Sequence, residues 1–305
     1  MSTTVANPFL DFVARAKTVN MLNLAIIDAL NMMTPLEVIH TTEEVHQKGW
    51  RLAGPPPDRT IEFTKVVRNA LVETVRSMYA AGKPQPEVYG REYLTPDVRL
   101  YFGGEDRDHR TLVVAFPGNG GRLMMPAPII LQHLPADRVD LMLVPDKLHA
   151  NYRKGIPPLA DTVADAMGPL GDLVPKGYRR VVAFGTSSGG VPSLIAAAAL
   201  GCDHVLAVGA GHPDDERWAE GLKYTKRQML VSAAPGLARC RITLAFGAQS
   251  PPDAVSAAAI RELLPHASIV PVSVPDIEVK HVALHRLVQA RLLRAFLGDH
   301  LGLQQ

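Results

Sequence analysis

The sequence has 305 residues, of which 47% are apolar and 20% are charged, a balance typical of a folded globular protein and not of a disordered one. The formal net charge is only +2, and Lys and Arg are scattered, so no nucleic-acid partner is expected. No apolar run reaches the length of a membrane span, because Asp28 interrupts the best candidate, 21–33.

The cysteines and the N-terminus indicate the cellular compartment. Cys202 and Cys240 have neither metal-binding nor redox spacing, and the first residues lack the basic start and apolar core of a signal peptide. We therefore expect a cytoplasmic protein without metal or cofactor. His40 and His46 lie near two glutamates, but solvated helix residues explain them better than a metal site does.

The first 85 residues are predicted to be a helical extension, residues 1–85. An Asn-Pro start predicts a helix from about Asn7 to Met33, and a shorter helix is expected over 36–48. The Gly-Pro-rich run 54–57 breaks the pattern, and apolar residues at helical spacing then predict a helix that Gly82 ends.

From Glu87 onward, short β-prone runs alternate with helical ones, which predicts a mostly parallel sheet with helices on both faces. Pro271 cannot donate to a strand ladder, so the last strand should lie at a sheet edge. The expected strands are 87–94, 98–103, 111–116, 139–144, 180–184, 205–209, 241–246 and 268–274. The expected helices are 126–134, 159–173, 191–200, 252–264 and 282–297.

One turn in this region has an unusual pattern. An apolar strand run enters Gly-Thr-Ser-Ser-Gly, residues 185–189, and an Ala- and Leu-rich helix follows. Such a turn holds a serine in a strained backbone conformation above the sheet edge, and small residues two before and two after the serine let strand and helix approach. Gly185 and Gly189 supply them around Ser187. The alternative interpretation is an ordinary glycine-rich strand-to-helix turn.

The chain from about residue 87 resembles the α/β-hydrolase superfamily, because eight candidate strands occur in the right order and the Gly-x-Ser-x-Gly turn follows the fifth. The resemblance implies an α/β-hydrolase domain over 86–305 with Ser187 as nucleophile. It also implies an oxyanion hole made by the amide of Ser188 and by an amide of the loop after the third strand. In that loop we expect the donor to be Asn119, with neighbouring Gly118 as the alternative.

The glycines of this loop, 118–121, invite a competing interpretation as a nucleotide phosphate loop. A Gly-x-Gly-x-x-Gly motif that starts at Gly118 would need glycine at position 123, where the chain has Leu123. No Gly-Lys-Ser/Thr follows either glycine turn, so a Walker loop is also excluded.

The resemblance further implies a histidine base just before the final helix and an acid after the seventh strand. His281 fits the base, and His285 lies one turn deeper in the expected helix. The family's usual Gly-x-x-Asp turn is changed here, because Ser250 stands at the position of the acid. We expect Asp253 to supply the carboxylate. Asp215 and Glu278 are left as alternative acids, and Ser250 is left as a neutral hydrogen-bond acceptor.

The segment 211–239 is long and corresponds to the insertion that caps the pocket in this superfamily. Its Trp218, together with His149 and His212 after the fourth and sixth strands, is expected to line the substrate pocket. The apolar residues of the segment fit the interior of the cap equally well.

These features predict a serine hydrolase that cleaves an ester or thioester of a small acyl substrate, free or carried by a partner, through an acyl-enzyme on Ser187. Acyl transfer or cyclisation would use the same serine. A non-catalytic binding protein with this fold is the alternative from another class. The amphipathic N-terminal helices leave a homo-oligomer open.

Overall fold

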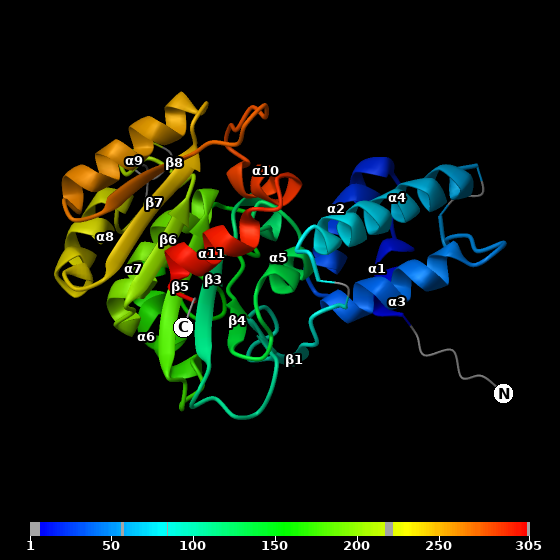
Figure 1. Ribbon diagram of the computed structural model, residues 1–305, viewed down its shortest axis with the longest axis horizontal. Helices are drawn as coiled ribbons and strands as arrows, with labels where there is room; N and C mark the ends of the chain where they lie inside the picture. The colour runs from blue at the N-terminus through cyan, green and yellow to red at the C-terminus, as the bar shows by residue number, and fades with distance from the viewer. Residues whose placement is uncertain (1–6, 56–57, 84, 217–221, 304–305) are drawn as a thin grey trace.

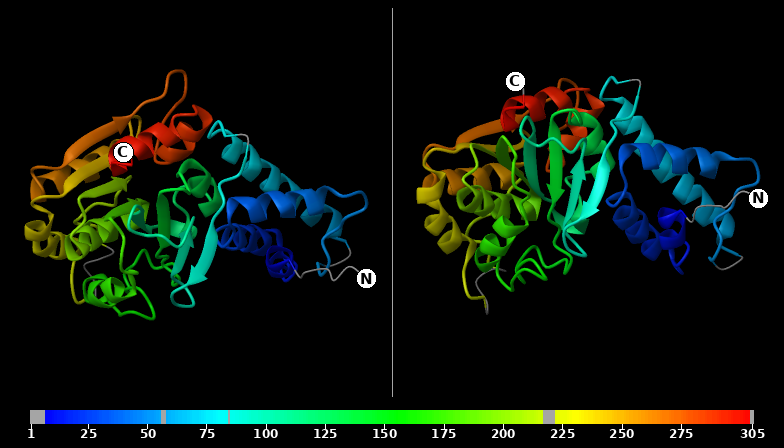
Figure 2. Two further views of the ribbon diagram at one scale, coloured as in Figure 1. Left: turned by 60° about the horizontal axis from the view of Figure 1, so that its bottom comes forward. Right: turned by 90° about the horizontal axis from the view of Figure 1, so that it is seen from below.

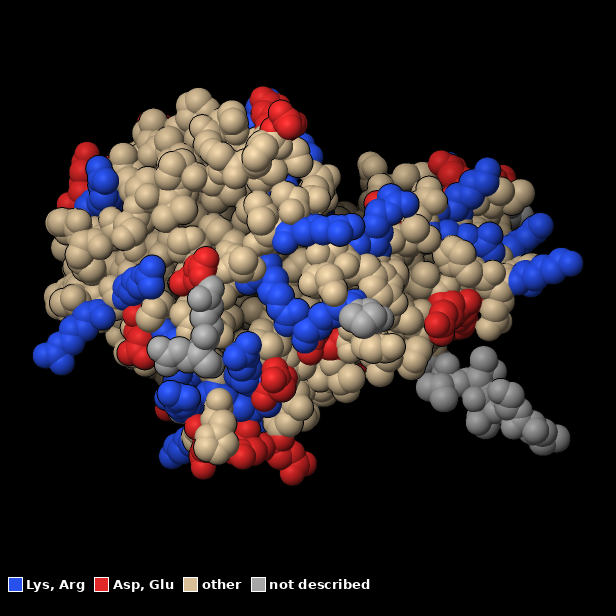
Figure 3. Space-filling view, in the orientation of Figure 1, with Lys and Arg blue, Asp and Glu red and all other residues tan. Residues whose placement is uncertain are grey.

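The computed structural model describes residues 7–55, 58–83, 85–216 and 222–303. In these ranges an eight-stranded sheet carries helices on both faces, and a group of N-terminal helices stands beside it (Figure 1). The two further views place that group on the β1 side of the sheet (Figure 2). Charged side chains of both signs are spread over the face in Figure 3, in keeping with the small net charge.

The N-terminal helices are α1 (Pro8–Val13), α2 (Val19–Leu30), α3 (Pro35–His46) and α4 (Thr60–Tyr79). The prediction of one helix from Asn7 to Met33 is wrong. The chain leaves the helix after Val13, and Thr18 starts α2 by accepting a hydrogen bond from the Met21 amide at 3.2 Å.

The strands are β1 (Gly90–Tyr93), β2 (Arg99–Phe102), β3 (Thr111–Phe116), β4 (Val139–Leu143), β5 (Arg180–Thr186), β6 (His204–Val208), β7 (Arg241–Gly247) and β8 (Ser268–Val272). Their order in the sheet is β1-β2-β4-β3-β5-β6-β7-β8, in which the β1–β2 and β2–β4 pairs are antiparallel and the other pairs are parallel. The predicted mostly parallel sheet is therefore confirmed. The edge position of β8, the strand that contains Pro271, is also confirmed. At an edge, the amide that proline lacks is not needed for pairing with a further strand.

Two helix layers cover the sheet. One face carries α5 (Ala127–His133), α10 (Ala283–Gln289) and α11 (Leu293–Leu301), and the other carries α6 (Val163–Leu173), α7 (Gly190–Leu200), α8 (Lys226–Ala233) and α9 (Pro251–Leu263). Successive residues of β3 point to opposite cores, with Val113 on the first face and Leu112 and Val114 on the second. The predicted helix 282–297 is two helices, because Arg291 takes a left-handed conformation between them.

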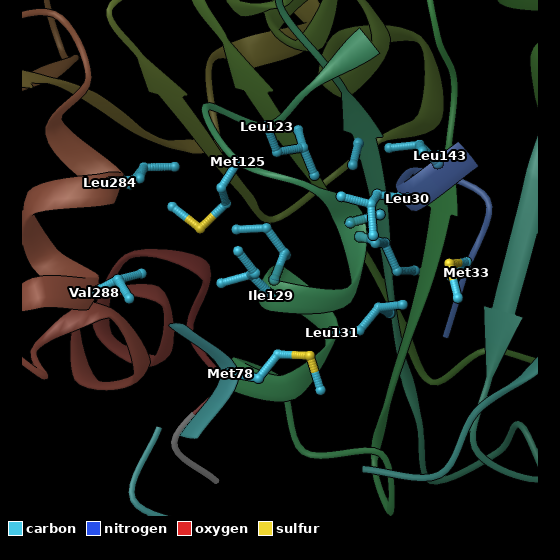
Figure 4. Close-up of a cluster of buried hydrophobic side chains, with 14 of the residues drawn as sticks. Leu30, Met33, Met78, Leu123, Met125, Ile129, Leu131, Leu143, Leu284 and Val288 are labelled. Atoms are coloured by element: carbon cyan, nitrogen blue, oxygen red, sulfur yellow. The ribbon is translucent and has the colours of Figure 1, made fainter. Parts of the chain in front are cut away.

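The apolar core on the α5 face continues into the N-terminal helices. Leu30 and Met78 of those helices, and Met33 between α2 and α3, pack in one cluster with residues such as Leu123 and Ile129 of the sheet region (Figure 4). Each such side chain contributes about 1.5–3 kcal/mol when it is fully buried. The predicted boundary at residues 85 and 86 lies between α4 and β1, but the hydrophobic core crosses it.

Two features are absent from the described ranges. None of their helices combines the length and apolar character needed to cross a membrane. Nor do those ranges bring together three or more His, Cys, Asp or Glu side chains that could hold a metal ion.

Candidate active site

Ser187 lies at the turn from β5 into α7, in a short 3-10 segment over Ser187–Gly189. Its φ of 52° is left-handed, which costs a non-glycine residue about 1–3 kcal/mol and is concentrated at functional sites. A Cβ on Gly185 would lie 2.3 Å from the Gly189 carbonyl oxygen, and a Cβ on Gly189 would lie 2.0 Å from that of Phe116. Both positions therefore require glycine, and the strained serine favours the nucleophile interpretation over an ordinary turn.

His281 is the histidine that the structure brings to this serine. Its Nε2 lies 3.1 Å from the Ser187 Oγ, within hydrogen-bond range, and its side chain is about half exposed, at 48%. His285, by contrast, sits in α10 and lines a cavity of about 660 Å³ together with residues of α4 such as Arg76 and Tyr79. Figure 3 shows the surface hollowed between the sheet region and the N-terminal helices.

Asp253 is the acid that reaches the histidine. It lies in the first turn of α9, is 8% exposed, and its two carboxylate oxygens are 2.9 and 3.0 Å from the His281 Nδ1. The turn after Gly247 is tight, since the Ser250 amide donates to the Gly247 carbonyl and the Asp253 amide donates to the Ser250 carbonyl. The carboxylate thus comes from Asp253, about one helical turn after the usual acid position, where the chain has Ser250.

The alternative acids have other partners. Asp215 lies 3.2 Å from the Lys226 ammonium group, and Glu278 lies 3.0 Å from that of Lys280. Ser250 remains close to the acid, because its side chain hydrogen-bonds to Asp253.

Electrostatics at the pair favour an ionised acid beside a basic imidazole. The hydrogen bond that the His281 Nδ1 donates to Asp253 raises the pKa of His281 above its ordinary value, although burial opposes this. Burial alone would raise the pKa of Asp253, but hydrogen bonds from His281 and Ser250 together lower it below the usual value. An ionised Asp253 holds a proton on the His281 Nδ1, and this leaves the Nε2 to accept the serine proton.

The loop after β3, residues 117–122, passes directly over the serine and contains a 3-10 turn over Asn119–Gly121. A Cβ on Gly118 would lie 2.9 Å from the Ser187 Cβ, so glycine permits this close approach. The Gly118 amide already donates to the Arg122 carbonyl at 2.9 Å and the Thr186 hydroxyl at 3.1 Å, which argues against the Gly118 alternative. Asn119 and Ser188 are the first and second residues of their 3-10 segments, where an amide has no partner within the helix, and among the described residues neither amide has an acceptor elsewhere.

Two residues that sequence reasoning missed hold this loop in place. Thr186, fully buried, accepts from the Gly118 amide and donates to the Arg122 carbonyl at 3.3 Å. The hydroxyl of Tyr152, also fully buried, lies 3.0 Å from the Pro117 carbonyl and 2.8 Å from the Val144 carbonyl, and so joins the loop to the end of β4. Thr186 stands inside the motif, whereas no sequence signal distinguishes Tyr152.

The predicted pocket residues come from the segments after β4 and β6. His149 has a left-handed backbone in the loop after β4, and the His212 ring accepts from the Asp214 amide after β6, so both lie beyond carboxyl ends of strands. Trp218 lies outside the described residues. Gly209 lies close to the His281 ring and to Met124. A Cβ at Gly209 would lie 3.1 Å from the His281 Cε1 and 3.2 Å from the Met124 methyl. Met124 was not among the expected residues.

The described part of the predicted cap, 211–239, lies in two places. Helix α8 and the 3-10 segment Ala234–Leu237 pack against α7 in the helix layer. Leu222 and Tyr224 border a cavity of about 140 Å³ beside Tyr152. A role of this segment in choosing the substrate stays a prediction.

Comparisons with known proteins add similarities to solved structures. No protein-family model matches the chain, and no curated protein does. An α/β-hydrolase enzyme from a lagoon-sediment metagenome of Mar Chica, Morocco, is 16% identical over 69% of this chain and 98% of its own, with a TM-score of 0.46. Dienelactone hydrolase from Anabaena variabilis is 16% identical over 70% and 97%, with a TM-score of 0.45. An esterase from the archaeon Pyrobaculum calidifontis is 12% identical over 88% and 97%, with a TM-score of 0.45.

The chain has the α/β-hydrolase fold. Its own strand order, with antiparallel strands at one edge and a strained serine between β5 and α7, defines that fold. The resemblance seen in the sequence from residue 87 onward is thereby confirmed.

Proposed function

We propose that this protein is a serine hydrolase that cleaves an ester or thioester through an acyl-enzyme on Ser187. The observation that carries the proposal is the continuous line of hydrogen bonds from the Ser187 Oγ to His281 and from His281 to Asp253. Such a line lets the imidazole take the serine proton as the hydroxyl attacks a carbonyl, and later give that proton to the leaving group.

The backbone around the serine supports the same chemistry. Attack places negative charge on the carbonyl oxygen, and preorganised amides that point at this charge lower the barrier. The amides of Ser188 and Asn119 are the donors we assign, because each is adjacent to the nucleophile in the chain or in space and has no acceptor among the described residues. Water then attacks the acyl-enzyme, with His281 as base.

The test is covalent labelling together with turnover. A fluorophosphonate should modify the wild-type protein at Ser187, which peptide mass analysis identifies, and short-chain p-nitrophenyl esters and acyl thioesters should be hydrolysed. Prior labelling should abolish turnover in proportion to the serine modified. A folded wild type that shows neither labelling nor turnover would overturn the proposal.

Acyl transfer remains compatible with the same serine, because only the acceptor that deacylates it would differ. The idea of a non-catalytic binding protein relied on the replaced acid position. Because an Asp253 carboxylate oxygen lies 2.9 Å from the His281 Nδ1, a charged partner is available to the histidine, and the replaced acid position no longer favours a non-catalytic protein.

Replacing Asp253 by asparagine tests the acid. We expect turnover to fall at least about a hundredfold, because an asparagine offers no charge to stabilise the imidazolium and can orient the wrong tautomer. The loss of Asp253 also removes the contact that raises the pKa of His281, so that pKa falls. The acid limb of the kcat/KM profile, which requires neutral His281, should therefore move to lower pH while its plateau drops.

The matched control is Ser250→Ala, which leaves the carboxylate in place. Its turnover should stay within about tenfold of the wild type, because Asp253 keeps its charge and both of its contacts with the His281 Nδ1. A nearly unchanged Asp253→Asn variant beside a severely impaired Ser250→Ala variant would instead make Ser250 the residue that orients His281.

Replacing Thr186 by valine tests the attachment of the oxyanion loop. Valine keeps the shape but removes the hydroxyl between Gly118 and Arg122, so the loop loses its link to the nucleophile turn. We expect kcat to fall about ten- to a hundredfold with little change in KM, since small displacements of positioned groups are costly. Thr186→Ser, which keeps the hydroxyl, should restore most of the rate. Equal rates for the valine and serine variants would contradict this role.

A further inference from the structure

The end of α2 lies against the segment that leads from the oxyanion loop into α5. Asn31, the residue that closes α2, is 3% exposed, and its side-chain oxygen accepts a hydrogen bond from the Ala127 amide at 3.3 Å across 96 residues of sequence. Ala127 is the first residue of α5, and the preceding Pro126 has no side-chain group to cap that helix. Asn31 thus supplies from the N-terminal helices a cap that the local sequence lacks.

The same side chain also lies beside the oxyanion loop itself. A Cβ on Gly121 would lie 3.5 Å from the Asn31 Nδ2, at van der Waals distance. Gly121 has a left-handed φ of 68° and comes two residues after Asn119. The amide group of Asn31 therefore lies between the two ends of the segment 121–127, which connects the loop to α5.

Asn31 is itself fixed on the sheet. Its carbonyl accepts a hydrogen bond from the Tyr101 hydroxyl of β2 at 2.7 Å, and the next carbonyl, of Met32, accepts one from the Arg91 guanidinium. Arg91 also pairs with Glu37 at 2.8 Å. Leu30, one residue before Asn31, belongs to the same hydrophobic cluster as Leu143 (Figure 4). The end of α2 cannot shift without disturbing these contacts.

From these contacts we infer that Asn31 is a positioning residue for the oxyanion loop, and that the N-terminal helices form part of the active site. The inference rests on the proposed function, because it assigns a catalytic consequence to the place of the Asn119 amide. An oxyanion donor acts only when it is held within about 0.5 Å of its working position. Thr186 and Tyr152 hold the start of the loop, and Asn31 holds its exit.

The test compares Asn31→Ala with Asn7→Ala, the same chemical change in the same group of helices at a residue whose hydrogen bonds go to α1 and α3 and not to the loop. Asn7 caps α1 and hydrogen-bonds to Thr41 and Glu44. Asn31→Ala should lower kcat about ten- to a hundredfold and leave KM within about twofold, because the loop binds the transition state and not the ground state. Asn7→Ala should keep the kcat of the wild type even if its unfolding temperature falls.

A second pair loosens Asn31 without changing it. Tyr101→Phe removes the hydroxyl that holds the Asn31 carbonyl, whereas Tyr178→Phe removes a hydroxyl that donates to Asp140 at 2.8 Å. Only Tyr101→Phe should lower kcat, by a smaller factor than Asn31→Ala. Hydrogen exchange of the Gly118 and Gly121 amides, which are bonded within the loop, should speed up in Asn31→Ala and not in Asn7→Ala.

The outcomes separate this inference from the proposed function. If the wild type turns over its ester and Asn31→Ala keeps that kcat within about twofold, the inference is overturned and the proposed function stands. If the wild type shows neither turnover nor labelling, the proposed function fails. Independently of activity, unchanged hydrogen exchange of the Gly118 and Gly121 amides in Asn31→Ala would overturn the positioning role. A loss of stability without a loss of kcat would mean that Asn31 serves the fold alone.

Discussion

Replacing Ser187 by alanine is expected to lower turnover by about 10⁶-fold, the loss found when one member of a catalytic unit is removed. The Oγ is the atom that would form the acyl-enzyme, and it lies 3.1 Å from the His281 Nε2. Alanine and serine differ by that oxygen alone and bear the left-handed φ of 52° at similar cost. The unfolding temperature should therefore change little. Steady-state kinetics with an activated ester, together with thermal unfolding, measure both quantities.

Ser188→Ala is the matched control for the nucleophile. The proposed oxyanion donor is the Ser188 backbone amide, which alanine keeps, and the Ser188 hydroxyl is buried without a partner among the described residues. Its turnover should stay close to that of the wild type. An inactive Ser188 variant beside an active Ser187 variant would show that the nucleophile has been assigned to the wrong serine.

The residues around Ser187 show what a sequence can predict about such a site. The elbow depends on contacts between residues a few positions apart, such as Gly185 against Gly189, so a five-residue pattern is enough to specify it. The alternation of apolar strands with amphipathic helices likewise depends on local periodicity, and it predicted all eight strands. His281 could be placed because the histidine follows the last strand in chain order.

The acid was harder to predict because its position depends on the shape of one turn. Gly247 begins the turn in the usual place, but the side chain that reaches His281 comes from Asp253, in the first turn of α9. Two prolines follow Ser250 and start that helix early. Sequence alone left the carboxylate and the neutral serine as alternatives, since a shift of three residues is decided by backbone geometry.

The roles of Asn31 and Tyr152 lay beyond sequence reasoning for a different reason. Each contact joins segments far apart in the chain, 96 residues for Asn31 with Ala127 and 35 for Tyr152 with Pro117. No periodicity or motif marks such residues, because their importance comes from what the folded chain places opposite them. The same holds for the breaks at 14–18 and 290–292, where helical composition continues but the chain turns.

Replacing His281 by alanine should abolish turnover and fluorophosphonate labelling together, with a loss on the order of 10⁶-fold in kcat. Without the imidazole, the Ser187 hydroxyl has no base to take its proton, and serine is a weak nucleophile at neutral pH. His285→Ala is the matched control. It removes a half-buried imidazole from the cavity between α10 and α4, where burial lowers the pKa of that histidine. The control should lose some stability and keep its rate. Equal and large losses from both substitutions would contradict the assignment of His281 alone as the base, and would place His285 within reach of the serine in the working enzyme.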